Sequence, residues 1–217
     1  LRVVTVGPTD GIAILMQHGT PCGGSLFAPH VDNARAHGIR LLGYDRPGYG
    51  GSSPQRGRTV ADCARDVEAI ADAFGLARLA VWGWSGGGPH ALACGALLPH
   101  RVAAVACLGS VAPGDAEGLE WFAGVGDDNV AEFGKALRGR QELADYLLPK
   151  REARLAGTAE QLHDDLRTLM TAIDTAALTG DFAEFLHREA RIAWGFGGDE
   201  KLSQDELLHE KYRGIRP

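Results

Sequence analysis

Apolar residues gather in four short runs in the first half of the chain, at residues 11–19, 38–48, 79–85 and 101–110. None of the runs alternates between apolar and polar positions, as a strand with one face in water would. Each has the length of a strand, and continuous apolar character is typical of strands covered on both faces. The pattern therefore predicts four buried strands of a mainly parallel sheet.

Two segments between these runs have helical spacing. Between the second and third runs, apolar residues recur at intervals of three or four, at Val60, Cys63, Val67, Ile70 and Phe74. Thr59 and Asp62 match a capping box, and Gly75 suits a C-terminal stop. Residues 89–98 predict a second helix between the third and fourth runs. Strands that alternate with helices predict βαβ units and a doubly wound α/β sheet.

The pattern changes after about residue 113. From Glu117 to Arg191 there is no convincing strand, and apolar positions follow helical intervals. Thr158 and Gln161 match another capping box. This region predicts a helical insertion or a small helical domain. The last 27 residues, 191–217, contain one brief apolar stretch, RIAWGF, which we interpret as the remnant of a strand.

Composition limits the class of protein. The 217 residues are 45% hydrophobic, enough for one substantial core or for one core with a small added domain. A net charge of -6 without a long basic run argues against nucleic acid and anionic membranes as partners. No apolar run reaches the roughly 18 residues that span a bilayer, and no signal peptide is recognisable. We therefore expect a soluble cytoplasmic protein whose oligomeric state stays open.

The four cysteines lack the CxxC spacing of metal and redox sites. Of Cys22, Cys63, Cys94 and Cys107, the last three lie in apolar segments. We expect buried, reduced thiols. No Walker A pattern and no convincing metal-ligand pair occurs, so the sequence predicts neither a cofactor nor a metal.

One serine stands at the centre of a glycine cluster. Gly83, Ser85 and Gly87 form G-x-S-x-G between a predicted strand and a predicted helix. A turn sharp enough to expose the Ser85 hydroxyl leaves no room for side chains two residues away on either side. The Gly86 N–H group at the start of the following helix is a natural oxyanion donor. The other interpretation is a glycine turn with a buried serine.

Two further loops favour the nucleophile. Residues 17–22, QHGTPC, follow the first long run, and the Thr20 N–H group would supply a second oxyanion donor. Residues 44–52, YDRPGYGGS, follow the next run, and we interpret Asp45 and Arg46 as loop-fixing residues. Three strand ends therefore converge on the edge of a parallel sheet where open α/β folds bind ligands.

With these motifs the sequence resembles the α/β-hydrolase family. The resemblance rests on residues 18–21 (HGTP), 45–52 (DRPGYGGS) and 83–87 (GWSGG), which stand in family order and at family-like intervals. It implies a core at residues 1–113, a helical cap at 114–190 and a C-terminal remnant of the core at 191–217. It also implies hydrolysis of a small ester, amide or related substrate through an acyl-enzyme on Ser85. Trp84, Trp121 and Phe122 suggest an apolar substrate.

The acid and base that the family places after the cap are not recognisable here. His90, His100, His163 and His187 fall on or beside predicted helices and are interpreted as surface or interhelix residues. His209 with Asp199 is the least unfavourable pair, although Ser203 and Glu206 predict a helix around His209. Asp115 is an alternative acid. If the chain is the whole protein, we expect weak or absent hydrolase activity; if it is part of a longer one, we expect the parent to be an ordinary hydrolase.

Two other functions are compatible with parts of the sequence. Gly86, Gly88 and Ala91 fit the G-x-G-x-x-A pattern of a dinucleotide site, but residues 92–114 contain no acidic residue to bind a ribose. A non-catalytic protein with the hydrolase fold, which binds a small molecule or a partner under the cap, remains the alternative that the missing base supports.

Overall fold

The computed structural model describes residues 1–113, 116–167, 170–178 and 180–195. Its centre is a five-stranded sheet in the order β1-β3-β2-β4-β5. The strands are β1 (Val3–Val6), β2 (Ile12–Gln17), β3 (Ile39–Tyr44), β4 (Leu79–Trp84) and β5 (Val102–Leu108). All neighbouring pairs are parallel except β1 with β3. The four predicted strands form, and the mainly parallel α/β class is confirmed. The expectation that all four are buried is wrong for β5, which lies at the edge of the described sheet and is exposed at every residue after Val102.

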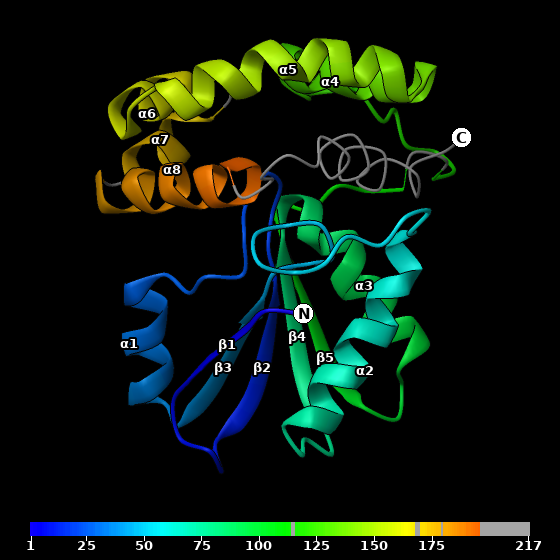
Figure 1. The fold of residues 1–217 in the computed structure, drawn as a ribbon, viewed down its shortest axis with the longest axis vertical. Coiled ribbons are helices and arrows are strands. Elements are labelled where there is room, and N and C mark those ends of the chain that lie inside the picture. Colours follow the sequence, from blue (N-terminus) through cyan, green and yellow to red (C-terminus); the bar gives the residue numbers. More distant parts are fainter. Residues whose placement is uncertain (114–115, 168–169, 179, 196–217) are drawn as a thin grey trace.

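Helices cover both faces of the sheet. α1 (Ala28–Ala36) lies on one face, and α2 (Cys63–Ala73) and α3 (Gly88–Leu97) lie on the other (Figure 1). The main core forms where α2 and α3 pack on the strands, and it includes Leu15, Leu42, Val67 and Val81. β1 and α1 were not predicted, since β1 has only four residues and α1 has a single buried residue, Ala34.

The ends of the predicted helices follow the expected local chemistry. The Thr59 N–H group donates to Asp62 Oδ2 over 2.8 Å, which completes the capping box before α2. Gly75, after the last turn of α2, has a φ of +65°, a conformation that glycine adopts without strain. The Thr158–Gln161 capping box also forms, with Gln161 N–H donating to Thr158 Oγ1 over 3.2 Å.

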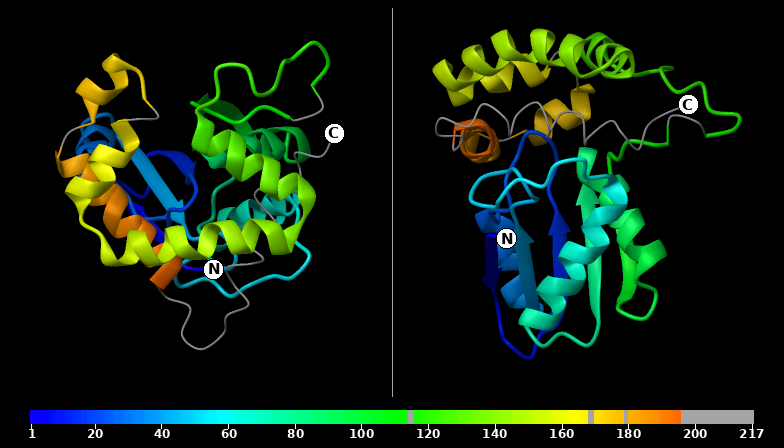
Figure 2. Two further views of the ribbon diagram at one scale, coloured as in Figure 1. Left: turned by 90° about the horizontal axis from the view of Figure 1, so that it is seen from above. Right: turned by 45° about the vertical axis from the view of Figure 1, so that its right-hand side comes forward.

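Five helices form a layer above the carboxyl ends of the parallel strands (Figures 1 and 2). They are α4 (Asp127–Arg138), α5 (Arg140–Ala156), α6 (Ala159–Arg167), α7 (Ala172–Ala177) and α8 (Gly180–Gly195). α8 lies nearest to the sheet and packs against α5 and α6. The helical character expected after residue 113 is confirmed; the division into core, cap and C-terminal remnant stays a prediction.

Two further expectations are wrong. Residues 191–195 continue α8 and do not form a strand, because Ala190, Ala193 and Trp194 extend the buried helical face of this helix. Cys107 is exposed, since it lies on β5 at the edge of the sheet, whereas Cys22, Cys63 and Cys94 are buried free thiols as expected. Across the part of the chain that the structure describes, no helix has both the length and the apolar character needed to cross a bilayer.

Candidate active site

Ser85 occupies a strained turn between β4 and α3. It opens a short 3-10 turn at residues 85–87, and its φ of +50° makes it the one non-glycine residue with positive φ in the described chain. A left-handed conformation at a residue with a side chain is costly and is typical of functional sites. The chain changes direction sharply at the end of β4, and Ser85 is partly exposed at this point.

The glycines beside Ser85 are required by close packing. A β-carbon on Gly83 would lie 2.4 Å from the carbonyl oxygen of Gly87. A β-carbon on Gly87 would lie 2.1 Å from the carbonyl oxygen of Gln17 and 2.7 Å from that of His18. Both separations are far below van der Waals contact, so neither position tolerates a side chain without backbone movement. The same contacts bring the loop after β2 against the Ser85 turn.

That loop carries Thr20, the predicted second oxyanion donor. It follows β2, and its Thr20–Pro21 peptide bond is cis. Gly19 packs on the indole of Trp84, with a hypothetical β-carbon 2.8 Å from the nearest ring atom. The structure therefore brings the Thr20 loop and the Ser85–Gly86 turn together, as the order of the motifs predicts.

His18 is an internal support of this loop. Its side chain is buried, Nδ1 donates to the Gly19 carbonyl over 2.8 Å, and Nε2 accepts the Arg46 N–H group over 3.2 Å. Burial, and secondarily the charge of Arg46, hold the pKa of His18 well below its usual range. A neutral imidazole with its proton on Nδ1 satisfies both bonds, so neither nitrogen is available to take a proton from Ser85.

Asp45 and Arg46 join the loops that surround the site. Asp45 Oδ1 accepts the Gly24 N–H group over 2.7 Å, Oδ2 accepts the Gly51 N–H group over 2.9 Å, and Arg2 lies 3.1 Å from the same carboxylate. Arg46 donates to the His18 carbonyl. Both side chains are almost fully buried. These contacts support the interpretation of Asp45 and Arg46 as loop-fixing residues.

The described histidines that follow Ser85 in the sequence are not placed as its base. His90 is buried on α3, and its Nδ1 donates to the Gly86 carbonyl over 3.0 Å. His187 bonds to the Gly157 carbonyl, His163 lies beside Asp164 within α6, and His100 is exposed near Glu68. None of these histidines is hydrogen-bonded to Ser85 within the described ranges. Asp115, Asp199 and His209 lie outside the residues that the structure describes.

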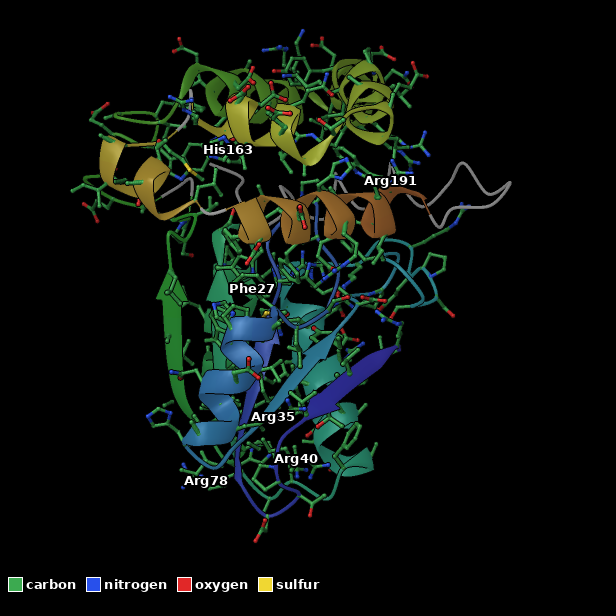
Figure 3. All side chains as sticks on the ribbon, turned by 90° about the vertical axis from the view of Figure 1, so that its left-hand side faces the viewer. Phe27, Arg35, Arg40, Arg78, His163 and Arg191 are labelled. Atoms are coloured by element: carbon green, nitrogen blue, oxygen red, sulfur yellow. The ribbon has the colours of Figure 1, made fainter. Side chains whose placement is uncertain are left out.

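An apolar cavity of about 210 Å³ lies between the sheet, the Thr20 loop and α8. Its walls come from β2, β4, β5, the segment 22–30 and α8, and they comprise Met16, Cys22, Gly23, Phe27, His30, Trp82, Trp84, Leu108, Phe182 and Phe185. Phe27 lies between α1 and α8 (Figure 3) and contacts both α8 phenylalanines, at ring-centroid distances of 5.2 and 5.1 Å. The cavity reaches Trp84, the residue before Ser85.

Only one of the three aromatic residues singled out in the sequence lines this cavity. Trp84 does, whereas Trp121 packs on Phe122 and Phe133 in a separate cluster beneath α4 and α5. The sequence carried a signal for the sheet side of the wall, since Met16, Trp82 and Trp84 fall on one face of neighbouring strands at two-residue spacing. The sequence carried no such signal for Phe27, Phe182 and Phe185, because these residues meet only when α8 folds over the core.

The described residues contain no group of three or more histidines, cysteines, aspartates or glutamates placed to hold a metal ion. The buried Cys63 and Cys94 thiols lie 3.5 Å apart between α2 and α3, away from the residues that line the cavity. Around Ser85 the described residues provide a serine hydroxyl, backbone N–H groups and a largely apolar wall that includes His30.

Comparison with known proteins gives one family. The alpha/beta hydrolase fold model matches residues 12–196. The non-heme chloroperoxidase of Streptomyces lividans is 34% identical over 113 residues, which are 49% of this chain and 40% of that protein. The chain thus matches less than half the length of this curated relative.

Solved structures agree with the family match. An alpha/beta hydrolase fold protein from Nakamurella multipartita aligns with a TM-score of 0.60 and 24% identity, over 98% of this chain and 70% of that one. A thermophilic esterase from Thermogutta terrifontis aligns with a TM-score of 0.63 and 17% identity, over 99% of this chain and 66% of that one. At these low sequence identities the structural alignments show a common fold and nothing finer. The match to the family model covers most of the chain. The chain therefore belongs to the alpha/beta hydrolase fold family.

Proposed function

We propose that this chain carries the nucleophile, the oxyanion donors and the substrate cavity of a serine hydrolase that acts on a small ester, amide or related acyl compound. The observation that carries the proposal is the left-handed Ser85 at the end of β4, held by glycines that admit no side chain. Such a conformation has a cost, and a buried structural serine would not need it. The turn places the partly exposed Ser85 at the carboxyl edge of the sheet, where substrates bind in open α/β folds.

The proposed reaction has two steps. The Ser85 oxygen attacks the substrate carbonyl carbon, the hydroxyl proton passes to a base, and the Thr20 and Gly86 N–H groups stabilise the negative oxygen. The leaving group departs with a proton, and water then hydrolyses the acyl-enzyme and restores the hydroxyl. Since the described histidines that follow Ser85 make other contacts, none of them is assigned as the base.

The cavity favours a small apolar substrate group. Its volume of about 210 Å³ is below the roughly 300–1,000 Å³ of sites for drug-sized ligands. Its wall is almost entirely apolar, and the esterase among the structural neighbours is consistent with an acyl substrate. We expect short acyl esters to react faster than long ones, and Phe185→Ala to shift the preference toward longer chains.

A fluorophosphonate probe tests the nucleophile. We compare the wild-type chain with Ser85→Ala and with Ser53→Ala, a control at an exposed serine in the neighbouring loop. The proposal expects slow labelling that Ser85→Ala abolishes and Ser53→Ala leaves unchanged. Labelling that persists in Ser85→Ala contradicts the proposal. Rapid stoichiometric labelling of Ser85 instead contradicts the expectation of weak activity for this chain.

Hydrolysis of short p-nitrophenyl esters separates the enzyme from the alternative, a binding protein with a hydrolase fold. An oxyanion hole and a binding site without a complete triad retain roughly 10³- to 10⁴-fold catalysis over water. Turnover in that range would persist in Ser85→Ala, so the acyl-enzyme is the discriminating signal. Intact-mass measurement after mixing with a short p-nitrophenyl ester should show an acyl adduct in the wild type and none in Ser85→Ala. If the wild type forms no adduct while short apolar esters still bind, the chain is a binding protein and the catalytic proposal is wrong.

A further inference from the structure

Glu189 on α8 is a fully buried carboxyl at the contact between the helical layer and the core. Its Oε2 accepts the backbone N–H group of Ser25 over 3.3 Å, so it binds the loop that continues from Thr20. Its Oε1 has no hydrogen-bond partner among the described residues. A buried carboxyl whose donors come from Ser25 alone is incompletely solvated, and such a group is costly in its ionised form.

A second carboxyl lies beside it. A β-carbon on Gly23 would be 3.0 Å from Asp45 Oδ1 and 3.1 Å from Glu189 Oε2, so the Gly23 backbone lies between the two groups. The two sides differ in their support. Asp45 is paired with the charge of Arg2 and accepts hydrogen bonds from Gly24 and Gly51, whereas the hydrogen bonds to Glu189 come from Ser25 alone, through its backbone and its side chain.

Two charged groups lie beside Glu189, one on the core loop and one on its own helix. From the core loop it faces the Asp45 carboxylate, which is paired with Arg2, and from its own helix it has Arg188, whose Nε lies 3.8 Å from Oε1. The Arg188 side chain is 62% exposed, so water screens its charge. Burial raises the pKa of Glu189 above its usual range, the Asp45 charge acts in the same direction, and the Ser25 hydrogen bonds and Arg188 oppose them.

We propose that protonated Glu189 is a latch that holds α8 against residues 23–25, and that loss of its proton releases this contact. The neutral carboxyl is compatible with the dry site and can still accept the Ser25 N–H group. The ionised carboxyl would place a second negative charge beside Asp45 without a buried cation to offset it. Water must then enter, and it can do so only if α8 separates from the loop. The latch gives the cap contact a pH dependence and makes Glu189 a positioning residue for the loop that carries Thr20.

Residue-resolved amide exchange by NMR between about pH 4 and pH 9 tests the proposal without any measurement of activity, so its outcome is independent of whether Ser85 reacts. The Ser25 amide reports on Glu189, and the adjacent Gly24 amide, bound to Asp45, is an internal control. The protection factor of the Ser25 amide is its intrinsic exchange rate divided by its measured rate. We expect this factor to fall by about tenfold per pH unit above the pKa of Glu189, until Ser25 exchanges as fast as an unprotected amide. Gly24 protection should change much less.

Two variants sharpen the test. Glu189→Gln is nearly isosteric with the protonated acid and cannot ionise, so it should keep Ser25 protected at every pH. Glu189→Ala should lose that protection at every pH; if it fails to fold, the wild type and Glu189→Gln still decide the question. Constant Ser25 protection in the wild type, or the same pH profile in Glu189→Gln, would overturn the latch.

Discussion

Arg46 donates a hydrogen bond from Nη1 to the backbone carbonyl of His18, 2.5 Å away, and thereby ties the loop after β3 to the loop after β2. The guanidinium also donates from Nη2 to Thr20 Oγ1 over 3.3 Å and lies over the Tyr49 ring at 5.0 Å from its centroid. A planar group that makes two such bonds and a ring contact is not matched by lysine. Arg46 therefore sets the position of the loop that carries the proposed oxyanion donor.

Arg46→Met should lower both stability and activity. It leaves the buried His18 carbonyl without its donor, which costs about 1–3 kcal/mol, and it frees Thr20 to move. We expect a lower urea midpoint at an unchanged m-value, and a larger loss in kcat than in KM for short esters. Arg78→Met is the matched control, because Arg78 is exposed at the end of the molecule away from the helical layer (Figure 3). Equal stability of the two variants would contradict the role of Arg46.

Gly87→Ala should damage the Ser85 turn. The added methyl group would lie 2.1 Å from the Gln17 carbonyl oxygen, so β2 or the turn must move. Overpacking of this kind costs about 1–3 kcal/mol, and we expect loss of fluorophosphonate labelling as well.

Gly134→Ala is the matched control for this substitution. Gly134 lies inside α4, and its β-carbon would meet only the flexible end of Arg138 at 3.7 Å. Alanine in an unobstructed helix interior should raise the free energy of unfolding by roughly 0.5–1 kcal/mol. Thermal unfolding of both variants provides the measurement, and Gly87→Ala with wild-type stability and labelling would show that the close approach is not needed.

Stability should depend on pH through His18. Because burial and Arg46 lower its pKa in the folded state, the unfolded chain binds a proton below about pH 6.5 while the native chain does not. The free energy of unfolding should therefore fall as the pH is lowered from about 7 to 5, by up to about 1.4 kcal/mol per pH unit from this residue. The contribution is complete above pH 6.5.

His18→Gln removes this titration. The difference in urea-unfolding free energy between the wild type and the variant isolates His18 from the other histidines, and also from Glu189, whose raised pKa acts in the opposite direction above about pH 4. We expect the difference to shrink as the pH falls. Parallel curves for the two proteins would show that His18 titrates in the folded state as it does in the unfolded one.

Local patterns were sufficient to predict most of the elements and the order of the motifs. The continuous apolar runs specify β2, β3, β4 and β5, although only the first three are largely buried. The Thr59–Asp62 and Thr158–Gln161 boxes and Gly75 mark helix ends through contacts within four residues. The placement of Ser85 at a strand-to-helix turn follows from the glycine spacing alone, because the steric demand of that turn is local.

Tertiary structure decided what depends on residues distant in sequence. Residues 191–195 continue α8 because the buried face of this helix packs against α5 and α6, a contact that the stretch RIAWGF by itself does not reveal. The cavity wall joins Phe27 to Phe182 and Phe185 across more than half of the chain. The buried state of Glu189 likewise exists only because α8 lies on the Ser25 loop. The Ser85 turn and the strands follow from local sequence, because their causes lie within a few residues. The cavity and the charge environment depend on the folded chain, since both arise from burial between separate segments.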